Sequence, residues 1–281
     1  MELLVGSEAH KALFCRTFVE TGEEYEPREL PWPVLDDGAL KRLRSLPIWG
    51  IALQAETNAG AMVSGFAATI SDPLIRQAVA LQGAEEERHG RMIATLVERY
   101  ELGAFATPPS LEPTEQAFIH FGYRECLDSF IGFGAFRMAR ETQFMPDALI
   151  ALFSRVLWEE ARHIVFFVNW IAYERVRRGY GGPFFAAVAG AIGYVRALVD
   201  MIVTGRQATG GSAEPPDFSA LAGVSLTRFL RAALYENDLL MARFDRRLLR
   251  PRVMPTIARC VLSAADAGRE LRAKVTPRAS G

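Results

Sequence analysis

The sequence predicts an all-α fold in which a four-helix bundle is followed by additional C-terminal helices. Apolar and small residues recur at helical spacing through most of the chain after about residue 40. Segments that contain proline or glycine interrupt this spacing and divide the chain into pieces of helix length. Sustained alternation of apolar and polar residues, which is typical of half-buried strands, is essentially missing from the sequence. These observations favour helices packed on helices.

The chain begins with a predicted N-terminal arm, residues 1–40, in which short apolar runs alternate with glycine and prolines. Two predicted helical hairpins follow and form a bundle over residues 41–180. The first consists of helices over about 47–70 and 73–102, with Ser71-Asp72-Pro73 providing a cap and a first-turn proline. The second consists of helices over about 113–143 and 146–178, with Met145-Pro146-Asp147 between them.

A glycine-rich segment ending at Pro183 closes the bundle, and residues 181–281 form a predicted helical cap. The cap contains a helix over about 184–204, a loop with glycines and prolines over 210–216, and one or two helices from 226 onward. The most apolar stretch, 183–205, includes Arg196 and Asp200, which makes it a poor membrane span. We therefore expect no membrane-spanning segment, and a buried or tunnel-lining position for this helix.

The composition is that of a single soluble domain over residues 1–281. Half of the residues are hydrophobic, 23% are charged and the formal net charge is -1, so no nucleic-acid partner is expected. The three cysteines are far apart and lack Cys-x-x-Cys spacing: Cys15, Cys126 and Cys260. This pattern favours a reducing, cytoplasmic location without disulfides or a cysteine-ligated metal. One basic cluster fits either a docking site for an acidic electron donor or a solvated face: Arg243, Arg246, Arg247, Arg250 and Arg252.

The pattern Glu-Glu-x-Arg-His occurs twice, at residues 85–89 in the second predicted helix and at 159–163 in the fourth. In each copy the second glutamate and the histidine are three residues apart, which places both on one face of a helix within reach of one metal ion. The two pairs are Glu86 with His89 and Glu160 with His163. A single copy is common by chance, but two copies in corresponding helices indicate a site.

Each copy follows, at hairpin distance, a carboxylate on an otherwise apolar helix. At a rise of about 1.5 Å per residue, Glu56 and Glu86 lie at similar heights on either side of the first turn. The same arithmetic for the second hairpin leaves Glu125 and Asp128 as alternatives. Burying an unpaired carboxylate costs on the order of several kcal/mol. Two divalent cations would offset the negative charge of the four carboxylates. The oxygen-rich ligand set with two imidazoles suits iron or manganese better than zinc or copper.

This arrangement resembles the di-iron carboxylate proteins of the ferritin-like superfamily over about residues 46–178. An acid before each ligand glutamate and an arginine before each ligand histidine resemble the bacterial multicomponent monooxygenases and ribonucleotide reductases more than the storage ferritins. The resemblance implies that Glu85 and Glu159 hydrogen-bond a metal-bound histidine of the opposing motif, with Arg88 and Arg162 as ionic supports. It also favours Glu125 over Asp128 as the ligand from the third helix.

The resemblance implies a non-haem di-iron oxidoreductase, with two iron ions or a manganese–iron pair, that uses O2 as co-substrate. Such an enzyme would hydroxylate, desaturate or otherwise oxidise a small, largely apolar organic substrate and would take electrons from an external donor. Val156 stands where aryl-amine N-oxygenases carry an additional histidine ligand, which argues against that activity. The alternative is a ferroxidase or iron-handling protein without an organic substrate. The sequence is compatible with a homodimer but does not identify the assembly.

Several residues near the predicted ligands fit a substrate cavity: Gly60, Val63, Gly132 and Phe167. The small residues among them fit close packing between helices as well. The sequence leaves both interpretations open.

Overall fold

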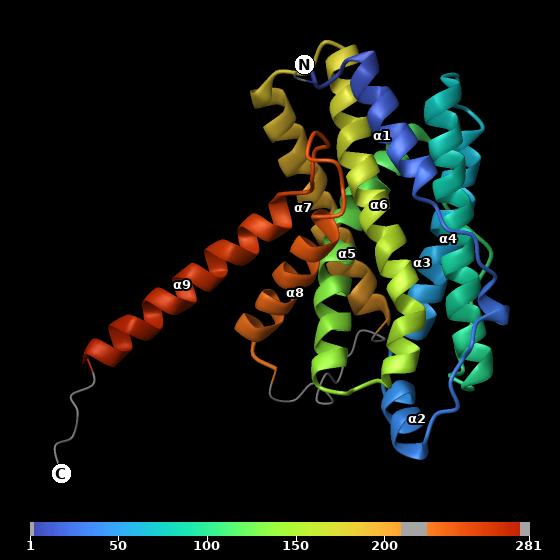
Figure 1. Cartoon of the computed structure of the whole chain (residues 1–281), viewed down its shortest axis with the longest axis vertical. Helices are drawn as coiled ribbons and strands as arrows, with labels where there is room; N and C mark the ends of the chain where they lie inside the picture. Colours follow the sequence, from blue (N-terminus) through green and yellow to red (C-terminus); the bar gives the residue numbers. More distant parts are fainter. Residues whose placement is uncertain (1–2, 209–223, 276–281) are drawn as a thin grey trace.

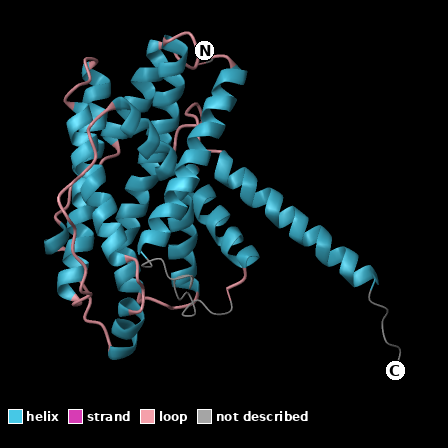
Figure 2. Cartoon of the chain, turned by 180° about the vertical axis from the view of Figure 1, so that it is seen from behind, coloured by secondary structure: helices cyan, strands magenta, loops and turns pink. Residues whose placement is uncertain are grey.

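Every regular element in the described residues, 3–208 and 224–275, is a helix (Figures 1 and 2). This computed structural model confirms the predicted all-α class. In chain order its elements are α1 (Glu8–Glu20), the 3-10 helix η1 (Pro27–Glu29), α2 (Asp37–Arg44), α3 (Trp49–Ala67), α4 (Pro73–Arg99), α5 (Glu115–Glu141), α6 (Asp147–Arg177), α7 (Pro183–Ala208), α8 (Leu226–Met241) and α9 (Val253–Val275).

Helices α3, α4, α5 and α6 occupy the four helical stretches predicted for the bundle. Helix α3 packs along α4 and α5 packs along α6, while α3 also contacts α5 and α4 contacts α6. Two of the starts follow the cap signals in the sequence. The Asp72 carboxylate accepts hydrogen bonds from two backbone N–H groups in the first turn of α4, and the Thr114 hydroxyl accepts one at the start of α5.

The core is divided into two apolar clusters with a polar layer between them. Along α4, Ile75 and Val79 belong to one cluster and Leu96 belongs to the other. The buried acidic, basic and histidine side chains of residues 85–89 lie between these positions. Along α3, Leu53 and Met62 belong to opposite clusters in the same way. The helices therefore hold a charged layer at mid-height, sealed by packed apolar side chains at both ends.

The predicted N-terminal arm is not an appendage, and this corrects the sequence interpretation. Residues 8–20 form α1, which lies across α4 and α6. Its Phe14, Cys15 and Phe18 side chains are buried in the first apolar cluster. Ser7 caps the helix by accepting a hydrogen bond from the backbone N–H of His10. Helix α1 was not predicted because it is short, and because the glycine and prolines that follow it interrupt the helical spacing of its apolar residues.

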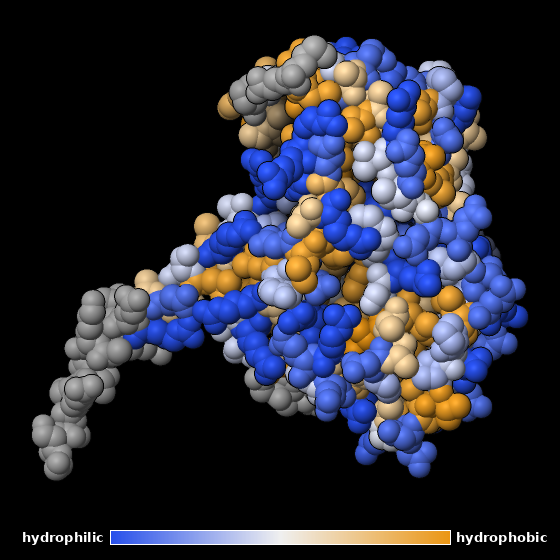
Figure 3. All heavy atoms as spheres, in the orientation of Figure 1, coloured by the Kyte–Doolittle hydropathy of each residue, from blue (hydrophilic) through white to orange (hydrophobic). Residues whose placement is uncertain are grey.

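The segment predicted to be a C-terminal cap is only partly one. Helices α7 and α8 pack on α5, whereas α9 contacts α8 and α5 and projects away from the other helices (Figure 1). An apolar strip runs along α9 between polar flanks (Figure 3), and three large apolar side chains of this helix are exposed: Val253, Ile257 and Val261. The loop predicted over 210–216 lies outside the described residues.

The surroundings of α7 differ from the predicted ones. By length and composition its segment Phe184–Thr204 could cross a membrane, yet only 6% of that segment is buried in the protein. The expectation of a buried helix is therefore wrong, and a tunnel-lining role for α7 stays a prediction. Its interior-facing Ala197 is fully buried, but large apolar side chains such as Phe184 and Val195 face outward. That α7 spans no membrane stays a prediction.

Candidate metal centre

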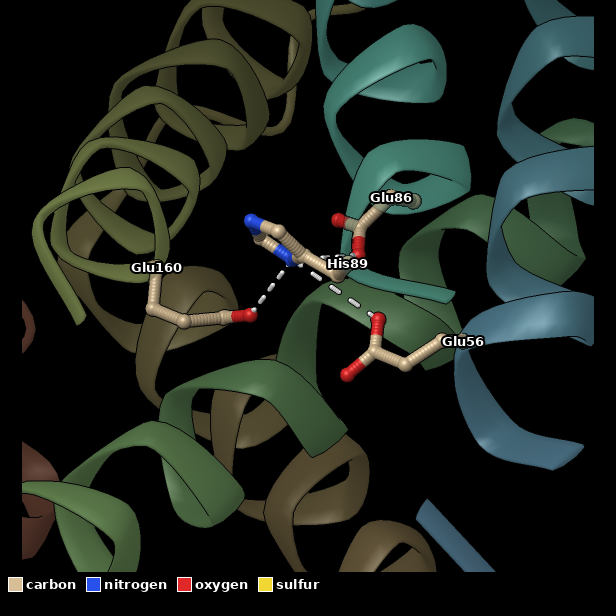
Figure 4. Close-up of side chains that lie close together, drawn as sticks. All are labelled: Glu56, Glu86, His89 and Glu160. Atoms are coloured by element: carbon tan, nitrogen blue, oxygen red, sulfur yellow. Dashed lines mark ion pairs between the residues drawn. The ribbon is translucent and has the colours of Figure 1, made fainter. Parts of the chain in front are cut away.

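Acidic and histidine side chains from four helices converge in the polar layer. Ligand-type atoms of one group lie within 4.8 Å of one another (Figure 4): Glu56, Glu86, His89 and Glu160. Those of a second group do the same: Glu86, Glu125 and His163. Helix α3 supplies Glu56, α4 supplies Glu86 and His89, α5 supplies Glu125, and α6 supplies Glu160 and His163. Glu86 belongs to both groups and lies between the two histidines.

Both histidines direct the same ring nitrogen toward the carboxylates. Nδ1 of His89 lies 3.1 Å from Oε1 of Glu160, and 3.7 Å from an oxygen of Glu56 and from one of Glu86. Nδ1 of His163 lies 2.9 Å from Oε1 of Glu86 and 3.9 Å from Oε2 of Glu160. The centroids of the two imidazole rings are 5.6 Å apart. Two imidazole nitrogens thus share one pocket of carboxylate oxygens.

The other ring nitrogen of each histidine is held by the opposing copy of the motif. Glu159 on α6 accepts a hydrogen bond from Nε2 of His89 at 2.8 Å, and Glu85 on α4 accepts one from Nε2 of His163 at 2.9 Å. A carboxylate in this position selects the tautomer whose Nδ1 carries a lone pair, and it fixes the orientation of the ring. The hydrogen bonds that the resemblance implied are present, and their role around a metal stays a prediction.

The arginine of each copy pairs with the acid of the opposing copy that also binds the histidine. Nη2 of Arg88 lies 2.5 Å from Oε1 of Glu159, and Nη1 of Arg162 lies 2.7 Å from Oε1 of Glu85. Each acid therefore receives an imidazole and a guanidinium from the opposing helix. Because these side chains are almost fully buried, the paired guanidinium offsets a carboxylate charge that would otherwise be very costly to bury.

Helix α1 supports one of these arginines, a contact that was not predicted from the sequence. Arg162 donates to the backbone carbonyl of Phe18 at 2.5 Å and to the hydroxyl of Thr21 at 3.0 Å. Its guanidinium carbon also lies 4.4 Å from the centroid of the Phe18 ring. The only available signal was the i, i+4 spacing of Phe14 and Phe18, which indicates a short amphipathic helix.

The segment after α1 supports the other arginine. The Tyr25 hydroxyl donates to Oε2 of Glu159 at 3.0 Å, and the guanidinium carbon of Arg88 lies 4.5 Å from the centroid of the Tyr25 ring. Nothing in the sequence around Tyr25 marks it as part of a site, because the segment has no helical or strand period. Its position depends on how α1 directs the chain beyond it.

The two alternatives for the ligand from α5 differ in their surroundings. Glu125 belongs to the second group, whereas Asp128, among the described residues, belongs to neither. The Asp128 carboxylate lies 2.5 Å from Nε of Arg124 and its side chain is 39% exposed. Three residues rotate a helix about 60° short of a full turn, which is enough to move a short side chain from the interior to the rim. We assign Glu125 as the candidate ligand.

The residues predicted to line a substrate pocket lie mostly in packed surroundings. A Cβ atom at Gly60 would lie 2.7 Å from Cγ of Glu87, so this glycine allows α3 and α4 to approach closely. Val63 and Phe167 are buried in the first apolar cluster, and only Gly132 faces open space. Two cavities of about 640 and 660 Å³ are lined by none of these four residues and by no candidate ligand. A substrate cavity beside the centre stays a prediction.

Burial and the charges of neighbouring side chains raise the pKa values of several groups in the cluster. Burial raises the pKa of Glu56 to about 8, and burial together with the charge of Glu160 raises the pKa of Glu125 well above its usual range. Burial alone would lower the pKa of His163, but the carboxylates of Glu86 and Glu85 outweigh it and raise that pKa to about 10. Protons on the imidazoles thus supply part of the positive charge that the carboxylates require.

Three buried atoms of the cluster have no hydrogen-bond partner of acceptable geometry in the part of the chain that the structure describes: Nδ1 of His89, Nδ1 of His163 and Oε2 of Glu125. Unpartnered buried polar atoms are rare because each costs about 1–3 kcal/mol. All three are atoms that coordinate divalent metal ions, and all three point into the two groups of carboxylates. The residues therefore fit a pair of metal ions, with one imidazole for each ion and Glu86 available to both.

Comparison with known proteins adds no family to these observations. No protein-family model, no curated protein and no solved structure matches the chain. Conclusions about the centre therefore depend on its own side chains and on what surrounds them.

The basic cluster after α8 is largely occupied by contacts within the chain. The guanidinium of Arg243 lies over the Trp158 ring, 3.5 Å from its centroid, and Arg247 pairs with Asp245 at 2.7 Å. Arg250 donates to backbone carbonyls within residues 241–248. These arginines hold the turn after α8, and docking of an electron donor at this place stays a prediction.

Proposed function

We propose that the chain is a ferritin-like non-haem di-iron oxidoreductase that activates O2, with α3–α6 as its four-helix bundle. The observation that carries the proposal is the reciprocal pairing of the two motifs. Each histidine gives Nε2 to an acid of the opposing copy and directs Nδ1 at carboxylate oxygens 2.9–3.1 Å away, without a hydrogen bond of acceptable geometry among the described residues. A metal ion between these atoms would satisfy both Nδ1 atoms and the carboxylates.

In this proposal one ion is held by Glu56, His89 and Glu160 and the other by Glu125 and His163, with Glu86 available to both. Four carboxylates and two imidazoles suit iron, or a manganese–iron pair, better than zinc or copper. When bound in the reduced state, the ions supply electrons for the reduction of O2.

The chain's own part is to orient the ligands and to exclude water. Glu85 and Glu159 hold the imidazole rings, the two arginines hold those acids, and the apolar clusters close both ends of the layer. The exposed fraction is greatest at the carboxylate side, where the Glu56 side chain is 21% and the Glu160 side chain 13% exposed. We propose that O2, and a small apolar substrate with electrons from an external donor, reach the centre from this side.

A second candidate is an iron-handling protein that oxidises ferrous ions and has no organic substrate. The packed surroundings of Gly60, Val63 and Phe167 favour it, because neither cavity of 640–660 Å³ touches a candidate ligand. The two candidates share the centre and differ in the fate of the oxidising equivalents and of the iron.

Metal analysis combined with oxygen uptake tests both candidates. Protein produced in iron-supplemented cells should contain about two irons per chain, and anaerobic reduction followed by O2 should give a rapid absorbance change. Metal contents equally low in the wild type and in a Glu86→Ala, His163→Ala variant would refute the proposal. Oxidation of ferrous ions well beyond two per chain, with iron accumulating, would favour the iron-handling candidate instead.

A further inference from the structure

A cavity of about 660 Å³ lies between α5, α6 and α7, outside the metal layer. Its walls include Ile119 and Tyr123 from α5, Ile171 from α6, and Phe184 and Ile192 from α7. Cavities of this volume hold single organic molecules in proteins. The walls of the cavity are therefore apolar, and its volume is large enough for one hydrocarbon chain.

Helix α7 gives this cavity its outer wall. A Cβ atom at Gly193 would lie 2.3 Å from the Tyr123 ring, so this glycine allows α7 to approach α5 closely. Phe184, Val188 and Ile192 are nevertheless 72%, 43% and 49% exposed. On a folded protein, a row of exposed apolar side chains indicates a surface that binds a ligand, a membrane or another protein.

Three arginines, Arg175, Arg178 and Arg196, line the same cavity together with two acids, Glu115 and Glu174. Both acids are already paired, because Arg178 lies 2.6 Å from Glu115 and 3.1 Å from Glu174. Counting three positive and two negative side chains leaves the lining with a net charge of +1. The unbalanced charge belongs to the other two arginines.

Arg175 is half-buried, and among the described residues its hydrogen bonds go only to neutral oxygens. It donates to the Tyr123 hydroxyl and, at 3.4 Å, to the backbone carbonyl of Ala186. Within the part of the chain that the structure describes, neither Arg175 nor the exposed Arg196 has a carboxylate partner. A guanidinium beside an apolar cavity without a counter-charge favours an anionic group, which it can bind through two parallel hydrogen bonds.

We propose that this cavity binds a single amphipathic anion, with its hydrocarbon chain against α5, α6 and α7 and its carboxylate at Arg175 and Arg196. The concave shape between three helices suits one molecule, whereas a bilayer or a second copy of the chain would contact only the outer face of α7. The site goes beyond the proposed oxidoreductase function, because no candidate metal ligand lines it.

Isothermal titration of the full-length protein with three probes tests the proposal. Decanoate carries both the charge and the chain, acetate carries only the charge, and decyl maltoside carries only the chain. Decanoate should bind, and each of the other two should bind at least about 10-fold more weakly. Binding of decyl maltoside as tight as that of decanoate would overturn the role of the arginines.

Variants separate the contributions of charge and wall. Arg175→Gln should weaken decanoate binding about 10-fold and Arg196→Gln about 3-fold, since charge-assisted hydrogen bonds are lost. Val188→Asp should weaken it by at least about 10-fold by placing a like charge in the wall. Arg140→Gln removes an exposed positive charge elsewhere on α5 and should bind decanoate as the wild type does. Unchanged binding in Arg175→Gln and Arg196→Gln together would refute the site.

Two further measurements exclude the other occupants of α7. Flotation with vesicles of phosphatidylcholine and phosphatidylglycerol should leave the protein unbound, and light scattering should show no dimer that Val188→Asp dissociates. Vesicle binding or such a dimer, in a chain that does not bind decanoate, would overturn the proposal. Glu86→Ala, which should bind metal more weakly, should keep decanoate binding, so failure of the metal proposal and failure of this one are distinguishable.

Discussion

The two copies of Glu-Glu-x-Arg-His make the same contacts across the helices but stand in different surroundings. Arg162 is fully buried, donates to Phe18 and Thr21, and has α1 lying over it. Arg88 lies against the Tyr25 ring, and its Nε atom has no hydrogen-bond partner. The two copies of the motif therefore receive unequal support, because α1 covers one copy and an irregular segment covers the other.

The ligands show the same inequality. Glu86 of the first copy is nearly inaccessible and belongs to both groups, whereas Glu160 of the second is 13% exposed at its side chain and belongs to one. The second copy thus has the firmer support and the first copy the more central ligand. Substitutions in each copy test this difference between the support of the arginines and the position of the ligands. Substitutions of the ligands should have the largest effect, which is on metal binding.

Glu86→Ala should weaken the binding of both metal ions, because each group loses a donor and the second group keeps only Glu125 and His163. Glu160→Ala should keep about one ion per chain, since Glu86, Glu125 and His163 remain. Metal content by mass spectrometry measures both. Equal losses in the two variants would contradict the central position of Glu86.

Arg162→Met should lower the free energy of unfolding by about 3–5 kcal/mol, because Glu85 would remain as a buried charge without its guanidinium. Arg88→Met should cost less, about 1–3 kcal/mol, since Tyr25 still donates to Glu159. Denaturant unfolding of the metal-free proteins compares the two. The reverse order would show that α1 contributes little to the second copy.

Glu85→Gln and Glu159→Gln should each weaken metal binding by about 10–100-fold, because an amide orients the imidazole less firmly than a carboxylate does. Their effects should be similar, given hydrogen bonds of 2.9 and 2.8 Å. Competition with a chelator measures the affinities, and Glu87→Gln on the other face of α4 is the control. A variant that binds metal as tightly as the wild type would remove that acid from the centre.

The metal-free protein should lose stability as the pH rises from about 6.5 toward 10. His163 has a folded-state pKa of about 10, above its unfolded value, so its stabilising contribution is complete below the unfolded pKa and is lost as the pH rises through the folded one. A decrease in Tm of about 3–6 °C is expected over this range. Calorimetry should show a smaller decrease in His163→Gln, and an equal one would assign the effect elsewhere.

Much of the helical framework was predictable from local pattern. Asp72 and Thr114 each stand at the start of a predicted helix, and both side chains cap the helices that begin there. Helix α1 was missed because its single buried stripe is short and is followed by glycine and prolines. The exposure of α7 was also missed, since an apolar run has the same composition whether it is buried or not.

The sequence by itself determined which residues could meet at the centre, because helical periodicity places Glu86 and His89 on one face and equal hairpin legs bring Glu56 to the same height. Helical spacing left Glu125 and Asp128 open, and the tertiary structure places Glu125 in one of the two groups and Asp128 beside Arg124, since their placement depends on a rotation of α5 by a fraction of a turn. Only the tertiary structure, likewise, placed Tyr25 and α1 beside the two arginines. Local spacing determines faces and heights along a helix, whereas the rotation of helices and the course of the chain around them depend on packing across the whole core.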